Sequence, residues 1–262
     1  MEMVSAVKMR RAQENVIAGR PYSGKMAMLL GHLALHQPPD ATHPLLQVRD
    51  TKRTAVLLIT SDRGLAGPIN SNAIRQAVAV ITGASAPVSI ISVGRRGRDW
   101  MIRRGRDVIA EVSGLSDRPS LLDVAPIARV VIDGFTRRDF DRVDLVYNRF
   151  VTTSTQEVVS EQLLPVRPVQ SERAFTEYIF EPGAEAVLRA LLPRFVEVQI
   201  YEAVLEAVAS EHSARMIAMH NATQNAQDVI QSLTLLYNKT RQSSITTEIL
   251  EIASGAEAVQ HG

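Results

Sequence analysis

The sequence contains no cysteine, and aromatic residues make up only 5% of its 262 residues. Without cysteine the chain forms no disulfide bond and offers no thiolate to a metal ion, so a reducing compartment is permitted. The low aromatic content argues against packing of the whole chain into one thick core. A formal net charge of only +1 gives no general attraction to polyanions, and we therefore expect no nucleic-acid partner.

Long hydrophobic runs are also missing. The longest aliphatic runs, such as Ala55 to Ile59, are far shorter than the roughly 20 residues that a membrane-spanning helix needs. The opening stretch "MEMVSAVKMRRAQ" lacks the continuous apolar segment of a secretory signal. We expect no direct insertion into a membrane, so any membrane association would depend on a partner.

Motifs of catalysis and cofactor binding are lacking too. The strand-and-loop stretch "VLLITSDRGLAG" contains neither G-x-x-x-x-G-K-[ST] nor G-x-G-x-x-G, so we interpret it as a structural turn rather than a nucleotide site. His32 and His36 are four residues apart without an H-E-x-x-H frame, which favours a surface pair over a metal site. No G-x-S-x-G elbow occurs. The sequence therefore predicts no catalytic residue, no cofactor and no metal ion.

Six arginines lie within the stretch from Arg95 to Arg106. Such a cluster can bind phosphate or nucleic acid. Asp99 and Asp107 partly neutralise this one, and no series of aromatic residues accompanies it. We interpret the stretch as a solvated helix face.

The order of elements is helix, α/β domain, helix. Residues 1–36 have helical spacing and form the amino-terminal coiled-coil helix, which "HQPPDATHP" ends because proline cannot continue a helix. Residues 37–51 form a linker. Residues 52–180 form the α/β domain, and residues 181–262 form a long carboxyl-terminal coiled-coil helix.

Strand and helix signals alternate between residues 52 and 180. The strand candidates are "TAVLLIT", "PVSIISV", "DVIAEV", "RVDLVYNRFV" and "AFTEYIF", and the helix candidates lie near residues 71–82, 94–104 and 120–138. This alternation predicts a mainly parallel sheet covered by helices. The fold class is therefore α/β, with two long terminal helices in an antiparallel coiled coil and a small, mainly parallel, Rossmann-like domain.

The second terminal helix has a regular apolar seam. It consists of Leu188, Leu191, Phe195, Val198, Tyr201, Leu205 and Val208, spaced by threes and fours. If residue 36 lies beside about residue 184, equal helical rise places Met1 beside about residue 219. Val229, Ile230, Leu233 and Leu236 then have no partner in this chain. Either another chain covers them, or the first helix is missing its start.

Specific residues near the carboxyl end carry a resemblance. The segment from Ala209 to Val259 closely resembles the gamma subunit of the F-type ATP synthase. The family signature, I-T-x-E followed by G-A, matches at Ile245, Thr246, Glu248, Gly255 and Ala256. "ITSDRGLAGPINSN", "VYNRFVTTSTQEVVSEQLLP" and "MEMVSAVKMRRAQ" resemble three further stretches of the family in the same order. The resemblance covers essentially the whole chain.

This resemblance implies a rotor. The terminal helices would form an axle inside a ring of alternating alpha and beta subunits, with the α/β domain at its foot beside the epsilon subunit and the membrane c-ring. ATP chemistry belongs to beta, so this chain would not be an enzyme. It would lie peripherally at the cytoplasmic face of a bacterial-type cell membrane.

The resemblance also assigns contacts to the polar end of the second helix. No large apolar residue occurs from Asn238 to Ser244. Arg241, Gln242 and Thr246 occupy the positions that catch a loop of the beta subunit. All three form hydrogen bonds, and an arginine fork suits a carboxylate.

Five further contacts follow from the resemblance. Lys8, Arg10 and Arg11 face the acidic lever of the beta subunit, for which a solvated helix face is an equally weighted alternative. Met1 and Arg215 are axle contacts.

The chain departs from the family pattern in two places. Ala66 replaces a small cysteine, and Pro68 is unusual in the same loop. Family members also carry about twenty residues before the stretch that opens this chain, enough to cover the apolar residues beyond residue 219. We expect an in-frame coding segment upstream of Met1.

Two alternatives to the rotor stay open. One is a stand-alone α/β ligand-binding protein with coiled-coil arms. The other is a non-functional, mis-started gene product. Nucleotide binding by the isolated chain separates the first from the rotor, for which it should be negligible.

Overall fold

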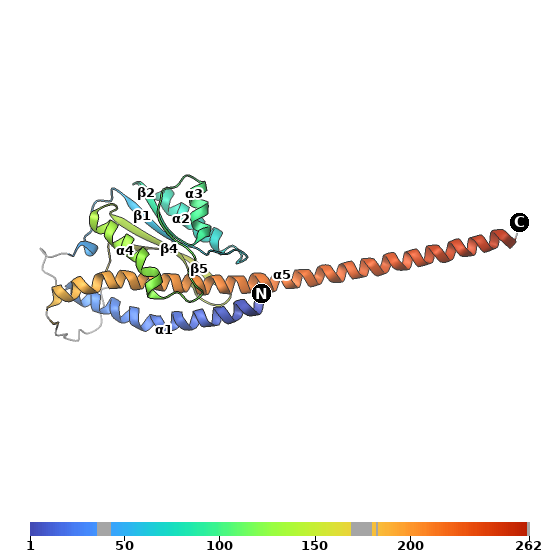
Figure 1. Ribbon diagram of the computed structural model, residues 1–262, viewed down its shortest axis with the longest axis horizontal. Helices are drawn as coiled ribbons and strands as arrows, with labels where there is room; N and C mark the ends of the chain where they lie inside the picture. The colour runs from blue at the N-terminus through green and yellow to red at the C-terminus, as the bar shows by residue number, and fades with distance from the viewer. Residues whose placement is uncertain (36–42, 169–179, 182, 261–262) are drawn as a thin grey trace. The chain divides into compact units, whose positions relative to one another are not determined.

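A computed structural model describes residues 1–35, 43–168, 180–181 and 183–260 (Figure 1). The chain comprises two compact units, Met1–Ile217 and Ala218–Gly262. The first unit holds a five-stranded sheet, the helices around it and the first terminal helix. The second unit consists of the last part of one long helix.

The sheet has the strand order β3-β2-β1-β4-β5. Its strands are β1 (Thr54–Ile59), β2 (Val88–Val93), β3 (Val108–Val112), β4 (Arg142–Phe150) and β5 (Gln156–Leu164). Neighbouring strands are parallel except β4 and β5, which form an antiparallel hairpin. The predicted mainly parallel sheet is therefore confirmed.

Helices α2 (Ile69–Gly83), α3 (Arg95–Arg103) and α4 (Leu121–Arg137) alternate with the strands. They begin and end within two residues of the predicted helices. The strand predicted over residues 174–180 lies outside the described residues except Phe180, which is in no strand. Strand β5 was not among the strands predicted from apolar patterns, although "VYNRFVTTSTQEVVSEQLLP" resembles a strand pair of the family, and β4 and β5 form that pair.

The central strand of the sheet is buried on both faces, which is why it reads as a continuous apolar run. All six residues of β1 are buried. Ala55, Leu57 and Ile59 lie in the large core cluster that includes residues of α1, α4 and α5. Val56 and Leu58 lie in the cluster with α2 and with Met101 of α3. Side chains alternate between the two faces, as they must along a strand.

The terminal helices are α1 (Glu2–Leu35) and α5 (Ala184–Gln260). Ala12 and Val16 of α1 are buried in one cluster with Leu205 and Ala209 of α5. The predicted register pairs residue 12 with about residue 208 and residue 16 with about residue 204. The antiparallel pairing is therefore confirmed.

Helix α5 is buried over a wider surface than one coiled-coil seam. Leu192, Val196, Ile200 and Val204 are 0–1% exposed, although none belongs to the predicted seam. They join the core cluster that contains the sheet and α4. A coiled-coil seam packs against one partner helix, whereas this part of α5 packs against both α1 and the α/β elements.

The predicted surface pair of histidines is wrong for His32. This side chain is buried, with 6% exposure. Leu30, Gly31 and Leu33 around it are buried too, so this turn of α1 has no solvated face. His36 lies outside the described residues.

The second unit consists of α5 from Ala218 onward, and its described side chains from 220 to 256 are exposed. Val229, Ile230, Leu233 and Leu236 are 56–62% exposed. Among the described residues no helix is long and apolar enough to cross a membrane.

The isolated chain is expected to associate through this apolar stripe, because contiguous exposed apolar surface promotes association. Amides of residues 220–250 should exchange quickly at high dilution, since an isolated helix is marginally stable in water. Hydrogen exchange measured against concentration tests this. Strong protection throughout 220–250 in a dilute monomer would contradict it.

Candidate functional site

The polar end of α5 presents an arginine and an amide to solvent. Arg241, Gln242 and Thr246 are all exposed. The Thr246 hydroxyl donates to the Gln242 carbonyl oxygen at 2.9 Å and is therefore occupied by its own helix. The Arg241 guanidinium makes no hydrogen bond or ion pair with the residues that the structure describes. Within the described part of the chain the Arg241 and Gln242 side chains have no partner, and the predicted contact stays a prediction.

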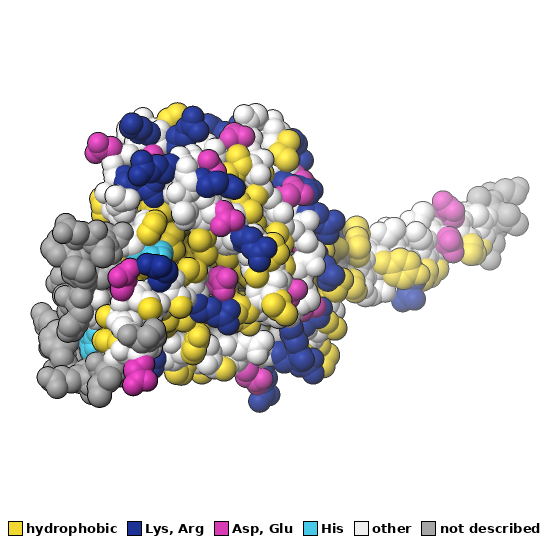
Figure 2. Space-filling model, turned by 60° about the vertical axis from the view of Figure 1, so that its left-hand side comes forward, with side chains coloured by type: hydrophobic (Ala, Val, Ile, Leu, Met, Phe, Trp, Pro, Cys, Tyr) yellow, Lys and Arg dark blue, Asp and Glu magenta, His cyan; other side chains and the backbone are white. Residues whose placement is uncertain are grey.

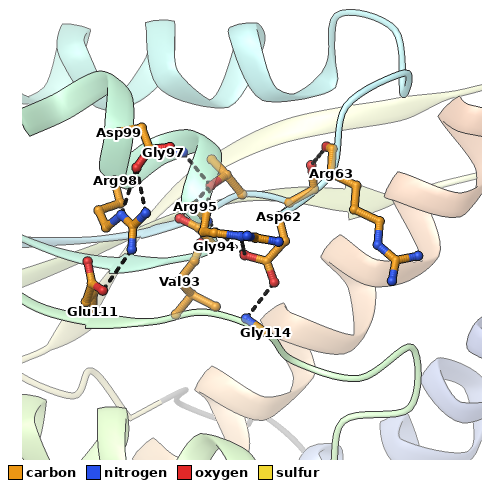
Figure 3. Close-up of polar contacts among 12 residues, drawn as sticks. Asp62, Arg63, Val93, Gly94, Arg95, Gly97, Arg98, Asp99, Glu111 and Gly114 are labelled. Atoms are coloured by element: carbon orange, nitrogen blue, oxygen red, sulfur yellow. Dashed lines mark hydrogen bonds and ion pairs between the residues drawn. The ribbon is translucent and has the colours of Figure 1, made fainter. Parts of the chain in front are cut away.

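A second polar region lies at the carboxyl ends of the parallel strands, where Asp62 joins three loops. One Asp62 oxygen accepts a hydrogen bond from the Arg95 backbone amide at 2.9 Å. The other accepts from the Gly114 amide at 2.6 Å (Figure 3). Asp62 follows β1, Arg95 follows β2 and Gly114 follows β3, so one carboxylate fixes the ends of three strands.

Gly94 allows two of these loops to approach each other closely. Its φ is +93°, a region that residues with a side chain rarely adopt. A Cβ at this position would lie 2.0 Å from the Thr60 carbonyl oxygen. The Thr60 hydroxyl also accepts a hydrogen bond from the Gly97 amide at 2.9 Å. Backbone contact between the β1 and β2 ends therefore requires glycine at residue 94.

A cavity of about 360 Å³ lies at this edge. It is found where the strand order reverses between β1 and β4, the usual ligand position in open α/β sheets. Its charged lining side chains are Asp62, Arg63, Arg95, Asp117 and Glu211. Both signs are present and no glycine-rich phosphate loop is among the lining residues, so the cavity has no evident phosphate site.

Helix α5 crosses this edge and is hydrogen-bonded to the loops there. Ser210 Oγ donates to the Asn148 carbonyl oxygen at 3.0 Å, at the end of β4. Ser213 Oγ donates to the Thr153 carbonyl oxygen in the β4–β5 turn. Tyr201 donates its hydroxyl to the Pro119 carbonyl oxygen at 3.2 Å. These bonds attach the helix to the loops where a doubly wound enzyme binds its ligand.

Comparison with known proteins covers nearly the whole chain. A family model described as ATP synthase matches residues 1–259. The ATP synthase gamma chain of Dehalococcoides mccartyi is 48% identical over 261 residues, which are 99% of this chain and 92% of the relative. The chain belongs to the ATP synthase gamma chain family. The gamma chain of Roseiflexus castenholzii is 48% identical over 264 residues, covering 99% of this chain and 91% of that one.

Solved structures of gamma-type stalks share the fold. The Tetrahymena thermophila mitochondrial ATP synthase central stalk and c-ring structure contains a chain with a TM-score of 0.66 and 25% identity. The match covers 85% of this chain and 97% of that one. A chain of the Euglena gracilis mitochondrial ATP synthase, 20% identical, has a TM-score of 0.61 over 98% of this chain and 96% of its own. The two long helices and the small sheet are thus features of the gamma family fold.

The gamma chain carries a group of charged side chains where α1, α5 and the β3–α4 loop meet. Lys8 Nζ of α1 lies 2.5 Å from Asp117 Oδ2 in that loop. His212 Nε2 of α5 lies 3.4 Å from Asp117 Oδ1. Arg215 forms an ion pair with Glu211 one turn away. It also donates to the Gly64 carbonyl oxygen at 3.4 Å.

Burial and pairing set the pKa values in this group. Burial lowers the pKa of His212 to about 4; the Asp117 carboxylate opposes this change, and the Arg215 charge adds to it. Burial raises the pKa of Glu211, although Arg215 opposes the increase. Burial would raise the pKa of Asp117, but its hydrogen bond with Lys8 lowers it overall. At neutral pH His212 is therefore an uncharged imidazole.

The other five side chains assigned from the resemblance differ in their exposure and in their partners. Arg10 and Arg11 are exposed, and Arg10 pairs with Glu14 at 3.5 Å. Met1 is 81% exposed. Lys8 and Arg215, in contrast, bind partners in their own chain. None of these contacts tests a role toward another subunit, so all five assignments stay predictions.

The arginine stretch of α3 and its flank is a solvated face, as predicted. Arg95, Arg96, Arg103, Arg104 and Arg106 are exposed. Arg98 is partly buried and pairs with Asp99 at 2.7 Å and Glu111 at 2.9 Å. On the face shown in Figure 2, Lys and Arg side chains are interspersed with acidic ones rather than gathered in one basic groove.

Sequence analysis missed Asp62, Gly94 and Asp117. Each lies in a loop directly after a strand or close to one, where the topology brings residues together that are far apart in sequence. The one available signal was position, since polar residues after parallel strands meet at the same sheet edge.

Proposed function

We propose that this chain is the central-stalk rotor subunit of a proton-translocating ATP synthase, carrying rotation between a membrane c-ring and a catalytic ring of alpha and beta subunits. The observation that carries the proposal is its similarity to gamma chains over 99% of its length, long helices included. The partners would be alpha, beta, epsilon and the c-ring. The chain itself would be non-catalytic, with ATP chemistry in beta.

The rotor proposal agrees with the character of the two units. Ion pairs, hydrogen bonds and apolar cores link α1, α5 and the sheet in the first unit. The second unit exposes polar and apolar side chains along a helix. A helix surface rich in amides and hydroxyls makes weak, replaceable contacts, which suit an axle that turns inside a ring. The complex would be held peripherally at the cytoplasmic face of the cell membrane.

The alternative of a stand-alone ligand-binding protein has less support. It would use the cavity at the sheet edge. Helix α5 is hydrogen-bonded across that edge, and the cavity lining offers no phosphate loop. The similarity to gamma chains also extends through both terminal helices, which a ligand-binding domain would not need.

Replacing Arg241 and Gln242 together by alanine tests the rotor proposal. We expect ATP turnover of the reconstituted complex to fall about tenfold, because a hydrogen bond to a charged group is worth about 1.5–3 kcal/mol. The unfolding transition followed through Trp100, the single tryptophan, should not change, since Trp100 belongs to α3.

Arg189→Ala is the matched control, because it removes an exposed arginine from the same helix within the first unit. It should leave turnover unchanged. If the double variant retains full turnover, or if it loses the Trp100 transition, Arg241 and Gln242 are not the predicted contact.

A further inference from the structure

Asp117 is positioned where three separate parts of the first unit meet. It belongs to the loop between β3 and α4, and its two carboxylate oxygens face different helices. Oδ2 accepts a hydrogen bond from Lys8 Nζ of α1 at 2.5 Å. Oδ1 lies 3.4 Å from His212 Nε2 of α5. One side chain thus links the sheet edge to both terminal helices.

The remaining contacts of this half of α1 are mostly apolar. Ala12 and Val16 pack against Phe150, Leu205 and Ala209. Apolar burial is non-directional, and the small side chains of Ala12 and Ala209 interlock little with their neighbours, so this packing restricts the rotational setting of α1 only weakly. A charged hydrogen bond is directional and fixes both partners in distance and angle. The Lys8–Asp117 contact is therefore a directional attachment of this half of α1, as the Arg20–Glu206 pair at 3.6 Å is farther along the helix.

His212 lies on the other side of Asp117. Its side chain is 3% exposed, and Nε2 lies 3.4 Å from Asp117 Oδ1 but makes no hydrogen bond in the described part of the chain. Arg215 Nη1 lies 3.4 Å from His212 Nδ1, so the neutral ring accepts there and carries its proton on Nε2, facing Asp117. The carboxylate thus lies between Lys8 of α1, which donates to it, and the His212 ring of α5, which faces it without a hydrogen bond.

We propose that Asp117 is a positioning residue that holds the amino-terminal half of α1 in one rotational setting against the α/β elements, with Lys8 as its partner; α5 is already attached to their loops by its own hydrogen bonds. This inference rests on the proposed rotor function. Torque that enters through the α/β elements reaches both helices of the axle only if α1 does not rotate against those elements. Lys8 then acts inside the rotor rather than toward the beta subunit.

The contact is suited to positioning more than to stability. The Lys8 and Asp117 side chains are 33% and 44% exposed. An ion pair with this exposure adds little to the stability of a folded chain, because water screens it. Loss of the pair should therefore broaden the relative setting of α1 and the sheet without unfolding the first unit.

Asp117→Ala in the full chain tests the geometry directly. The chain contains no cysteine, so spin labels would attach only at two introduced cysteines, Arg10→Cys on α1 and Arg129→Cys on α4. We expect the fraction of molecules whose label-to-label distance lies outside the main peak to rise about two- to fivefold. This is the change in population that the free energy of an exposed ion pair can produce. The Trp100 unfolding transition should stay the same.

The second measurement uses the membrane-reconstituted complex. ATP-driven proton pumping per ATP hydrolysed should fall by a similar factor with Asp117→Ala, while hydrolysis itself is retained. The exchanged pair Lys8→Asp with Asp117→Lys should restore pumping and narrow the distance distribution. Glu185→Ala is the control, since it breaks an exposed ion pair within α5 alone.

The outcomes separate the two proposals. An unchanged distance distribution with Asp117→Ala overturns the positioning role, whatever the complex does. A lowered unfolding transition without the broader distribution also overturns it, because it shows a purely structural residue. A wild-type chain that fails to support pumping contradicts the rotor function, and the distance measurement still decides the role of Asp117.

Discussion

Gly94→Ala is expected to unfold the α/β elements, with a loss of about 4 kcal/mol or more in the free energy of unfolding, the range of exceptional single substitutions. A Cβ at residue 94 would lie 2.0 Å from the Thr60 carbonyl oxygen and 2.7 Å from its carbonyl carbon. These are backbone atoms at the end of a fully buried central strand, so they have nowhere to move. The φ of +93° adds strain of its own.

The measurement is denaturant unfolding followed by Trp100 fluorescence in the dilute full chain. Trp100 belongs to α3, the helix that Gly94 precedes, and therefore reports on this region. Gly105→Ala is the matched control, since Gly105 has φ +67° but open space around it. Gly105→Ala should lower the free energy of unfolding by only about 1–2 kcal/mol, which is the effect of the left-handed backbone alone. Equal losses for the two variants would show that the close approach to Thr60 is unimportant.

The comparison between sequence and structure shows why the elements were predictable. Apolar runs such as Thr54–Ile59 and Val88–Val93 indicate buried parallel strands, because both faces of each strand need an apolar side chain. Once an antiparallel pair with residue 36 beside residue 184 was assumed, helical rise gave the register of α1 and α5, since both helices advance equally per residue. Local pattern and chain geometry were sufficient for these features.

Other features depend on contacts that no local pattern records. The sheet packs against α5 at Val196 and Ile200, so the coiled-coil seam alone underestimated how much of that helix is buried. His32 is buried together with its neighbours Leu30, Gly31 and Leu33, which the spacing of the two histidines could not show. A helical pattern shows which side chains are apolar, but it does not show how many neighbours surround the helix.

The polar residues at the sheet edge were the hardest to predict. Asp62 bonds to amides at residues 95 and 114, which lie 33 and 52 positions along the chain. Asp117 meets Lys8 across 109 positions. Their loops come together only in the strand order β3-β2-β1-β4-β5, and the alternation of strand and helix signals does not specify which strands are neighbours. The family resemblance pointed to the helix surfaces and left this edge unassigned.

The free energy of unfolding is expected to depend strongly on pH through His212. Burial lowers the pKa of this imidazole to about 4 in the folded chain, whereas an unfolded histidine has its ordinary value of about 6.5. Between these values the unfolded chain binds a proton that the folded chain does not. The stability contributed by neutral His212 is therefore complete above about pH 6.5 and is lost as the pH falls toward 4.

Comparison with His212→Gln isolates this effect. Glutamine keeps a donor but does not titrate, and Glu211, Asp117, Lys8, Arg63 and Arg215 around it are present in both chains. The difference in unfolding free energy, wild type minus variant, should fall by about 3 kcal/mol from pH 6.5 to pH 4, at about 1.4 kcal/mol per pH unit. Trp100 fluorescence at each pH provides the measurement. A difference that stays constant would mean that the Asp117 carboxylate cancels the effect of burial, and one that grows as the solution is acidified would mean that the carboxylate outweighs it.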